Sequence, residues 1–239
     1  MRIQLSITLA AFICTISLAQ NMEYSAYLTT SLSLWERAVA EKQAHFDQNS
    51  SIENRYQLAL TQFGLVNATM KDQEEKTFNK YADDLEDHLD YLIDEGYQAA
   101  NAKALLSGLY GFKIGHSSWK GMFLGSKASS LATAALSEDP ESPIVRKMYA
   151  NNKLFTPEVW GGDVSEAIKS YERSQELFEA QDTDTFNWMY LDNFAWLGQA
   201  YQQKENYAAA EATYKKALEV EQGFSWIKYG LLPALAQND

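Results

Sequence analysis

Residues 194–217 read FAWLGQAYQQKENYAAAEATYKKA, and this stretch decides the fold. Large and small residues recur in it at helical spacing on both sides of a tight turn. Two antiparallel helices approach to roughly 8–10 Å only where one offers a small residue to a large residue on the other. Gly198 and Ala210 supply the small surfaces, and Tyr201 and Tyr214 fill the space beside them. The stretch therefore predicts a helix, a turn and a second helix.

This spacing closely resembles that of a tetratricopeptide repeat (TPR). The positions that carry the resemblance are Phe194, Leu197, Gly198, Tyr201, Tyr207, Ala210, Tyr214 and Ala217. One repeat cannot bury its own apolar face, so we expect further helix pairs stacked on it. Glycine and proline are few elsewhere, and the apolar residues recur every three or four positions. We predict an all-α fold, a TPR-like right-handed superhelix of antiparallel helix pairs with a capping helix at each end.

The first nineteen residues have the pattern of a secretory signal peptide. Arg2 precedes an apolar run, and Ser17 and Ala19 are small residues at alternate positions, which predicts cleavage between Ala19 and Gln20. The run is shorter than the roughly 20 residues that span a bilayer. Cys14 lies within it, too early to be a lipid attachment site. We expect a periplasmic or secreted protein without membrane insertion after cleavage.

Composition narrows the classes of partner. Cys14 is the one cysteine, so the mature chain has neither disulfides nor thiolate metal sites and is held by its core. The net charge of −12 becomes −13 once Arg2 leaves with the signal peptide. Nucleic acid and anionic membrane surfaces are poor partners for such a chain.

The mature chain is expected to form one domain, residues 20–239. We predict a cap helix over 24–46, helix pairs over 52–94, 97–137, 142–180 and 184–222, and a closing helix over 225–236. Asp163 and Glu166 have the spacing of a capping box, and Ser51 can cap the helix that follows it. Two segments depart from the repeat: an insertion at 115–119 and an irregular turn at 155–163.

Some motifs have a narrower resemblance. Residues 110–115 (YGFKIG), the joint 139–143 (DPESP) and the turn 156–163 (TPEVWGGD) resemble exported repeat proteins common in the Bacteroidetes. A proline followed by Gly-Gly-Asp at the head of a second helix is also similar to the periplasmic T-component of TRAP transporters. That second resemblance implies a helical repeat protein that assembles into a ring with a substrate-binding partner.

No residue pattern indicates catalysis, so we expect a protein that is not an enzyme and has no cofactor or metal. The three histidines lack the spacing of a zinc site, and no nucleophile elbow or phosphate loop is present. Residues 83–90 (DDLEDHLD) are strongly acidic. A divalent cation there is the alternative to a solvated acidic face, which we expect because a regular helix lacks loop carbonyl ligands.

Candidate binding residues come from the groove that first helices line in this fold. The groove positions expected in the last pair are Asp192, Gln199 and Gln202. Lys147 and Asn151, four residues apart, resemble the first half of a clamp for a peptide's C-terminal carboxylate, but the next helix lacks the second half. On this hypothesis, replacing Lys147 by glutamate weakens partner capture and leaves stability nearly intact.

The remaining candidates are His116, Trp119 and Trp160 in the two irregular segments, and Lys113 just before the first of them. Each tryptophan is either a ligand platform or a plug that anchors its turn, and we expect the plug. Residues 103–153 are also rich in basic side chains, which either steer an acidic ligand or only keep this region soluble; these are Lys103, Lys113, Lys120, Lys127, Arg146, Lys147 and Lys153.

Two classes of function remain open. The first is a non-enzymatic scaffold outside the cytoplasm, which binds a peptide or an envelope protein in its concave groove. The second is an accessory of organic-acid transport, as the T-component resemblance implies. A ring of three in solution favours the second class, and a monomer disfavours it. The sequence leaves the oligomeric state open.

Overall fold

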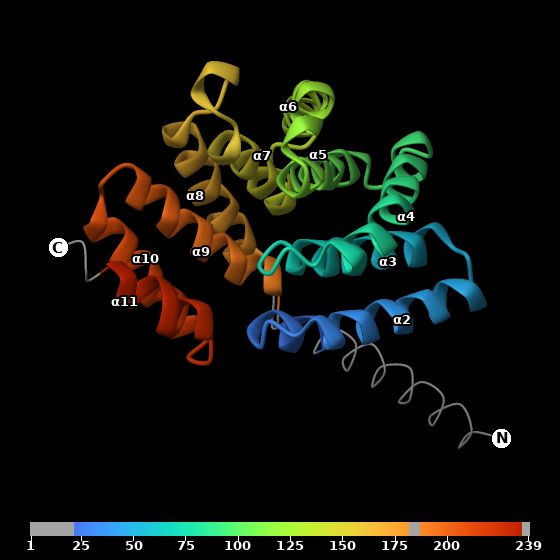
Figure 1. Cartoon of the computed structure of the whole chain (residues 1–239), viewed down its shortest axis with the longest axis horizontal. Helices are drawn as coiled ribbons and strands as arrows, with labels where there is room; N and C mark the ends of the chain where they lie inside the picture. The colour runs from blue at the N-terminus through green and yellow to red at the C-terminus, as the bar shows by residue number, and fades with distance from the viewer. Residues whose placement is uncertain (1–21, 182–186, 236–239) are drawn as a thin grey trace.

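The computed structural model describes residues 22–181 and 187–235, which form helices and no strands. After a first helical segment over residues 22–28, the helices stack in chain order as successive antiparallel neighbours (Figure 1). They are α2 (Leu32–Gln48), α3 (Ile52–Ala68), α4 (Glu75–Asp94), α5 (Ala99–His116), η1 (Ser118–Lys120), α6 (Gly121–Glu138), α7 (Pro143–Phe155), η2 (Glu158–Trp160), α8 (Val164–Ala180), α9 (Trp188–Gln203), α10 (Tyr207–Val220), η3 (Trp226–Leu231) and α11 (Leu232–Leu235). The all-α, TPR-like fold is confirmed.

The stretch that decided the fold forms α9 and α10. A Cβ added to Gly198 would lie 2.1 Å from the Tyr214 ring, so the two helices meet where the sequence places its smallest residue against a tyrosine. Tyr214 is fully buried, as are Ala210 and Ala217. Asn206 begins α10 by accepting a hydrogen bond from the Ala209 N–H. The spacing of large and small residues is thus a packing pattern between two helices.

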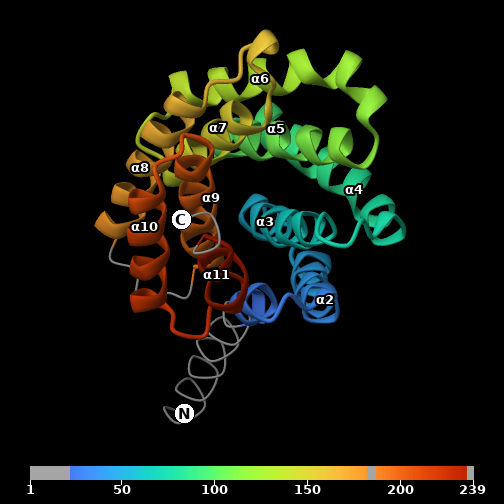
Figure 2. The same ribbon diagram turned by 60° about the vertical axis from the view of Figure 1, so that its left-hand side comes forward.

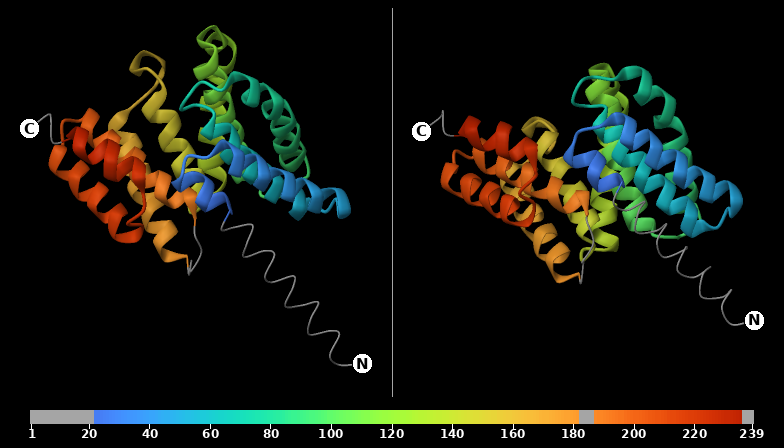
Figure 3. Two further views of the ribbon diagram at one scale, coloured as in Figure 1. Left: turned by 60° about the horizontal axis from the view of Figure 1, so that its bottom comes forward. Right: turned by 90° about the horizontal axis from the view of Figure 1, so that it is seen from below.

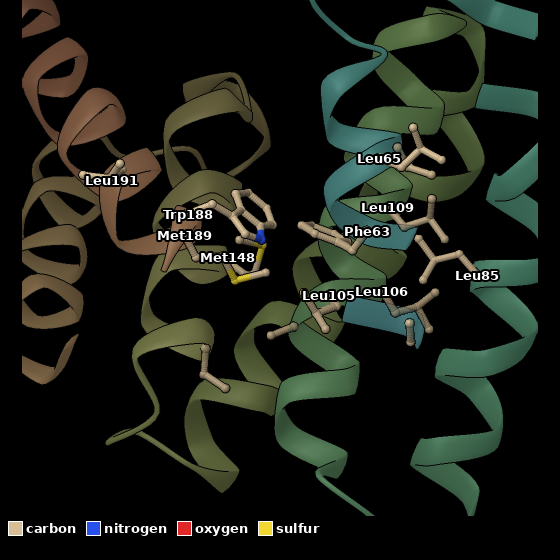
Figure 4. Packing of buried hydrophobic residues seen from close by; sticks show 14 of the residues in the cluster. Phe63, Leu65, Leu85, Leu105, Leu106, Leu109, Met148, Trp188, Met189 and Leu191 are labelled. Atoms are coloured by element: carbon tan, nitrogen blue, oxygen red, sulfur yellow. The ribbon is translucent and has the colours of Figure 1, made fainter. Parts of the chain in front are cut away.

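The concave side of the stack is filled by the chain itself. Figure 2 shows α3 inside the arc that α5, α7 and α9 form. Phe63 of α3 points toward α5 and α7, where a Cβ on Gly108 would lie 2.9 Å from its ring and 3.2 Å from the sulfur of Met148 (Figure 4). Gly108 therefore gives α3 the room to sit inside the arc, and the main core forms around it.

The cap helix expected over 24–46 is two helices. The first ends at a turn in which Thr30 has a left-handed backbone with φ of 51°, and the Ser31 N–H donates to the Ala26 carbonyl. The hydroxyl of Ser31 then caps α2 by accepting from the Leu34 N–H. The prediction of one continuous helix was wrong because the apolar periodicity continues across the turn, while the cap at Ser31 ends one helix and begins the next.

The insertion expected at 115–119 is also corrected. Helix α5 continues through Gly115 and His116, and η1 leads almost directly into α6. Gly115 lies against Met70, whose methyl group would be 2.5 Å from an added Cβ. Gly115 is therefore a helical residue that lets Met70 pack closely. The sequence did not predict this, because a glycine followed by histidine and two serines is also typical of a loop.

The capping box and the closing helix differ from expectation as well. Asp163 caps α8 by accepting from the Ser165 and Glu166 N–H groups, but Glu166 binds Tyr149 and Lys153 instead of completing the box. The closing helix expected over 225–236 is helical over 225–235, first as the π-helix η3 and then as the single α turn of α11, which contains Pro233.

Several expectations fall on residues outside the described ranges. They are the signal peptide over 1–19, the start of the last helix pair over 184–186, and residue 236 of the closing helix. Within the described ranges, no helix combines the length and apolarity that crossing a bilayer requires.

Candidate binding site

The groove candidates are engaged inside the protein. Lys147 of α7 is 1% exposed, and its ammonium lies 2.5 Å from a carboxylate oxygen of Asp192 of α9, which is also buried. The phenol of Tyr27 donates to the other oxygen of Asp192 over 2.8 Å. Lys147 therefore lies on the inner face of the stack, but it is not accessible to a partner there, because residues from the N-terminal segment cover it.

The other groove candidates also bind neighbouring helices or their own helix. Asn151 accepts a hydrogen bond from the Tyr171 phenol over 2.5 Å. The amide of Gln202 donates to the Tyr214 phenol, and that of Gln199 to the Ala195 carbonyl of its own helix. Lys147 and Asn151 therefore do not form the first half of a carboxylate clamp, because both side chains already have partners within the protein.

The basic stretch is mostly neutralised internally. Lys103 pairs with Glu138, Lys113 with Asp83 and Glu86, and Lys153 with Glu166, while Arg146 donates to a backbone carbonyl. Together with Lys147, five of its seven members have such contacts. Within the part of the chain that the structure describes, three of the seven have no ion-pair partner, namely Lys120, Lys127 and Arg146. Arg146 is held by its carbonyl acceptor, whereas Lys120 and Lys127 also lack a side-chain hydrogen bond, so their charges are the ones free to act on a ligand.

The acidic helix α4 uses its carboxylates to hold other helices. Asp84 accepts from the Gln62 amide over 2.6 Å, and its Oδ2 lies 3.5 Å from Nε2 of His88. The Arg55 guanidinium donates to Nδ1 of His88 over 2.9 Å, a contact that requires this nitrogen to be unprotonated. Burial, and then Arg55, lower the pKa of His88, although Asp84 and Asp87 act against them.

This arrangement is structural, since Arg55 also stacks over Phe46 and Tyr91 and so joins α2, α3 and α4. Within the ranges that the structure covers, no three His, Cys, Asp or Glu residues gather in a way that would hold a metal ion.

Both tryptophans of the irregular segments are exposed. Trp119 in η1 is 61% exposed and Trp160 in η2 is 78% exposed, so the expectation that they plug their turns is wrong. The η2 turn is nonetheless firmly built: the Gly162 N–H donates to Pro157, and Gly161 has a φ of 94°. The turn holds Trp160 and its neighbour Val159 in solvent, at the same end of the molecule as α6 (Figure 1).

A pocket of about 300 Å³ lies beside Trp119, and we call it the aromatic pocket. Helices α4, α5, η1 and α6 each contribute to its lining, which consists of Glu86, Tyr110, Lys113, Trp119, Lys120, Phe123 and Leu124. Trp119 and Phe123 meet edge to face with ring centroids 6.0 Å apart. Phe123 is 62% exposed. The pocket thus offers apolar and aromatic surface with a lysine at its edge.

Hydrogen bonds fix the floor of the aromatic pocket. The Tyr110 phenol donates to Glu86 over 2.9 Å, and burial, followed by this carboxylate, raises the tyrosine's pKa. Lys113 bridges Glu86 and Asp83; burial alone would lower its pKa, but the two carboxylates outweigh it and raise it. Each charge in this network therefore has an opposite partner, which leaves Lys120 as the charged lining residue without an ion pair in the part of the chain that the structure describes.

The sequence-derived candidates meet at this pocket only in part. Lys113 and Trp119 line it. His116 faces the other way, stacked on Phe78 at 4.1 Å and 3.3 Å from the Thr69 hydroxyl. Burial, with Lys120 nearby, lowers the pKa of His116. Trp160 lies in a separate turn.

Phe123 was missed, although a signal for it existed. Ala128, Ala132 and Ala135 form the buried stripe of α6, whereas Phe123 falls four residues before Lys127 and shares the exposed face with it. A large apolar residue on the polar face of an amphipathic helix marks a contact surface.

The geometry defines an all-α helical repeat protein with an exposed aromatic pocket, and comparison with known proteins agrees on the class. The tetratricopeptide repeat profile matches residues 191–223. No curated protein matches the sequence significantly. The match covers most of α9 and the whole of α10.

Two solved structures share the fold. The HusA haemophore from Porphyromonas gingivalis is 15% identical, with a TM-score of 0.61 over 77% of this chain and 92% of that one. A thermophilic TPR protein from Thermus thermophilus is 18% identical, with a TM-score of 0.56 over 90% of this chain and 99% of that one. At these identities the likeness concerns the fold.

Proposed function

We propose that this chain is a non-catalytic interaction protein that works outside the cytoplasm and contacts its partner through the aromatic pocket. The observation that carries the proposal is the exposure of Trp119 and Phe123 around a pocket, whereas the aromatic repeat residues Phe194 and Tyr214 are buried. The signal peptide pattern supports the location, and the scarcity of catalytic groupings supports a binding role.

The pocket suits one large side chain of a protein partner. A volume of about 300 Å³ is at the lower end of ligand sites and accommodates an aromatic or long aliphatic group. Interface energy concentrates in such anchors when they enter an apolar pocket. Lys120 at the rim favours a carboxylate next to the anchor. We therefore expect a partner segment with an aromatic or aliphatic residue beside an acidic one.

A photo-crosslinking amino acid at position 123 tests this directly in the cells that export the protein. Tyr229 is the matched control position, since it is an aromatic residue, 74% exposed, on the last helices and not among the residues that line the pocket. Position 123 should give a discrete adduct that Lys120→Glu diminishes, whereas position 229 should not. Identical adducts at both positions would contradict a specific pocket.

A flat amphipathic ligand is the second candidate. HusA is described as a haemophore, and aromatic edges beside the Lys120 ammonium suit a planar molecule with a carboxylate. Titration with haemin, followed by its absorbance and by tryptophan quenching, separates the two candidates. Saturable binding that Phe123→Ala weakens favours the ligand, and an unchanged spectrum removes it.

The T-component type of transport accessory stays a third expectation. Sedimentation of the mature chain tests it, because the expectation requires a stable ring of three. A monomer would leave the interaction protein as the better description.

A further inference from the structure

The first described segment, residues 22–30, lies between the two ends of the stack, and we call it the strap. It begins beside the last helices and leads into α2 on the other side, as both panels of Figure 3 show. The Tyr24 phenol donates to Glu221 over 2.9 Å, and the Ser225 hydroxyl donates to the Leu28 carbonyl over 3.1 Å. The strap therefore closes the concave side by contacts with residues almost 200 positions away.

The contacts of the strap are those of a short helix bound in a groove. Tyr27 inserts its ring between Trp188 and Phe224, each with a centroid 5.6 Å away, and its phenol reaches the buried Asp192. Glu23, one helical turn before Tyr27, accepts a hydrogen bond from Thr61 of α3 over 2.5 Å. Burial raises the pKa of Glu23. Anchors one helical turn apart are typical of helix-in-groove recognition.

The strap is also a separate helical unit. Its helix ends with the carbonyl of Ala26 accepting from Ser31, and α2 begins with its own cap at the same serine. The joint, Thr29 and Thr30, is exposed. Swinging the strap away at this joint breaks no hydrogen bond within α2, so the joint can act as a hinge.

The groove beneath the strap has acceptors matched to two phenols. Asp192, held by Lys147, receives Tyr27, and Glu221 receives Tyr24. A partner helix that covered Asp192 without a donor there would leave one of its carboxylate oxygens buried with one partner fewer, which is costly. This chemistry selects a donor at that depth and rejects an aliphatic or acidic side chain there.

We propose that the strap is an intramolecular occupant of a second binding groove, whose partner is a short amphipathic helix with two tyrosines three residues apart. A partner peptide of this kind displaces the strap and takes over the Asp192 and Glu221 hydrogen bonds. The groove is distinct from the aromatic pocket and belongs to α9, the segment after α10, and the inner face of α3.

Cutting the joint tests the proposal. A protease site placed at Thr29 and Thr30 of the mature chain allows cleavage after folding, and a fluorescent peptide of residues 20–30 is then added. We expect the cleaved protein to stay folded and to exchange its strap for the peptide. Changing the peptide's Tyr27 to Phe should weaken binding about tenfold or more, since a bond to a buried carboxylate is lost.

The controls distinguish a strap that a partner can displace from one that the fold requires. Uncleaved protein should bind the peptide much more weakly, because its own strap competes at high local concentration. Unfolding on cleavage would overturn the proposal by showing that the stack does not fold without a tethered strap, and so would a folded, cleaved protein that does not take up peptide. Phe123→Ala should leave exchange unchanged, so this test and that of the aromatic pocket can fail separately.

Discussion

Replacing Lys147 by methionine should strongly destabilise the protein. The change keeps most of the apolar stem but removes the ammonium 2.5 Å from Asp192. Asp192 is 3% exposed, so its charge would stay buried with only the Tyr27 hydrogen bond. Breaking a buried pair from one side costs about 3–5 kcal/mol. This is a large part of the roughly 5–15 kcal/mol that holds a typical domain together.

Urea unfolding at pH 7, followed by helical circular dichroism, measures the effect. Lys147→Met with Asp192→Asn should recover much of the loss, because the uncompensated charge is gone, and the double-mutant cycle isolates the coupling. Lys120→Met is the matched control and should change stability by no more than about 0.5 kcal/mol. Equal small losses for Lys147→Met and Lys120→Met, with no coupling to Asp192, would refute the buried pair.

Three further outcomes follow from the structure. Gly198→Ala should cost about 1–3 kcal/mol in urea unfolding by overpacking, whereas Gly125→Ala, with no atom within 4 Å of the added Cβ, should stabilise α6 by about 0.5–1 kcal/mol; equal effects would contradict the helix contact. Folding lowers the pKa of His88, so below pH 6.5 the unfolded chain binds a proton there more readily than the folded protein does. The contribution of the neutral His88 side chain to folding stability is therefore complete above pH 6.5 and is lost as the pH falls below that value. Wild type should therefore lose more stability than His88→Gln between pH 7 and 5, by at most about 1.4 kcal/mol per pH unit, and the contribution of Glu23, which has the opposite sign, cancels in this comparison. Intact-mass analysis of the exported protein should give Gln20 as its first residue, and retention of residues 1–19 would contradict the signal peptide.

The fold could be predicted from the sequence because the contacts that define it join helices that are adjacent in the chain. The contact of Gly198 with Tyr214 joins two helices separated by one short turn, and the residue sizes specify it directly. The cap helix was mispredicted for a related reason. Apolar spacing says which face is buried, but Ser31 and the left-handed Thr30 decide where one helix stops and the next begins.

The candidate site was less predictable because exposure depends on distant parts of the chain. The sequence placed Lys147 and Asp192 on the inner face, and they do meet there. It could not show that this face is covered, since the covering residue, Tyr27, lies 165 positions from Asp192 in the chain. For Trp119 the opposite holds: α5 runs on to His116, so the tryptophan starts a new turn at the surface and has nothing to plug.

Mutations in the groove covered by the strap and mutations in the exposed aromatic pocket should have different effects. Strap and groove side chains take part in the core, so changing Tyr27 or Asp192 alters stability and access together. Trp119, Phe123 and Lys120 lie at the surface, and their replacement should change binding with little effect on unfolding. Loss of binding without loss of stability is therefore diagnostic of the aromatic pocket. Binding that increases as stability falls is the signature of a displaced strap, and the two effects can be read from the same set of variants.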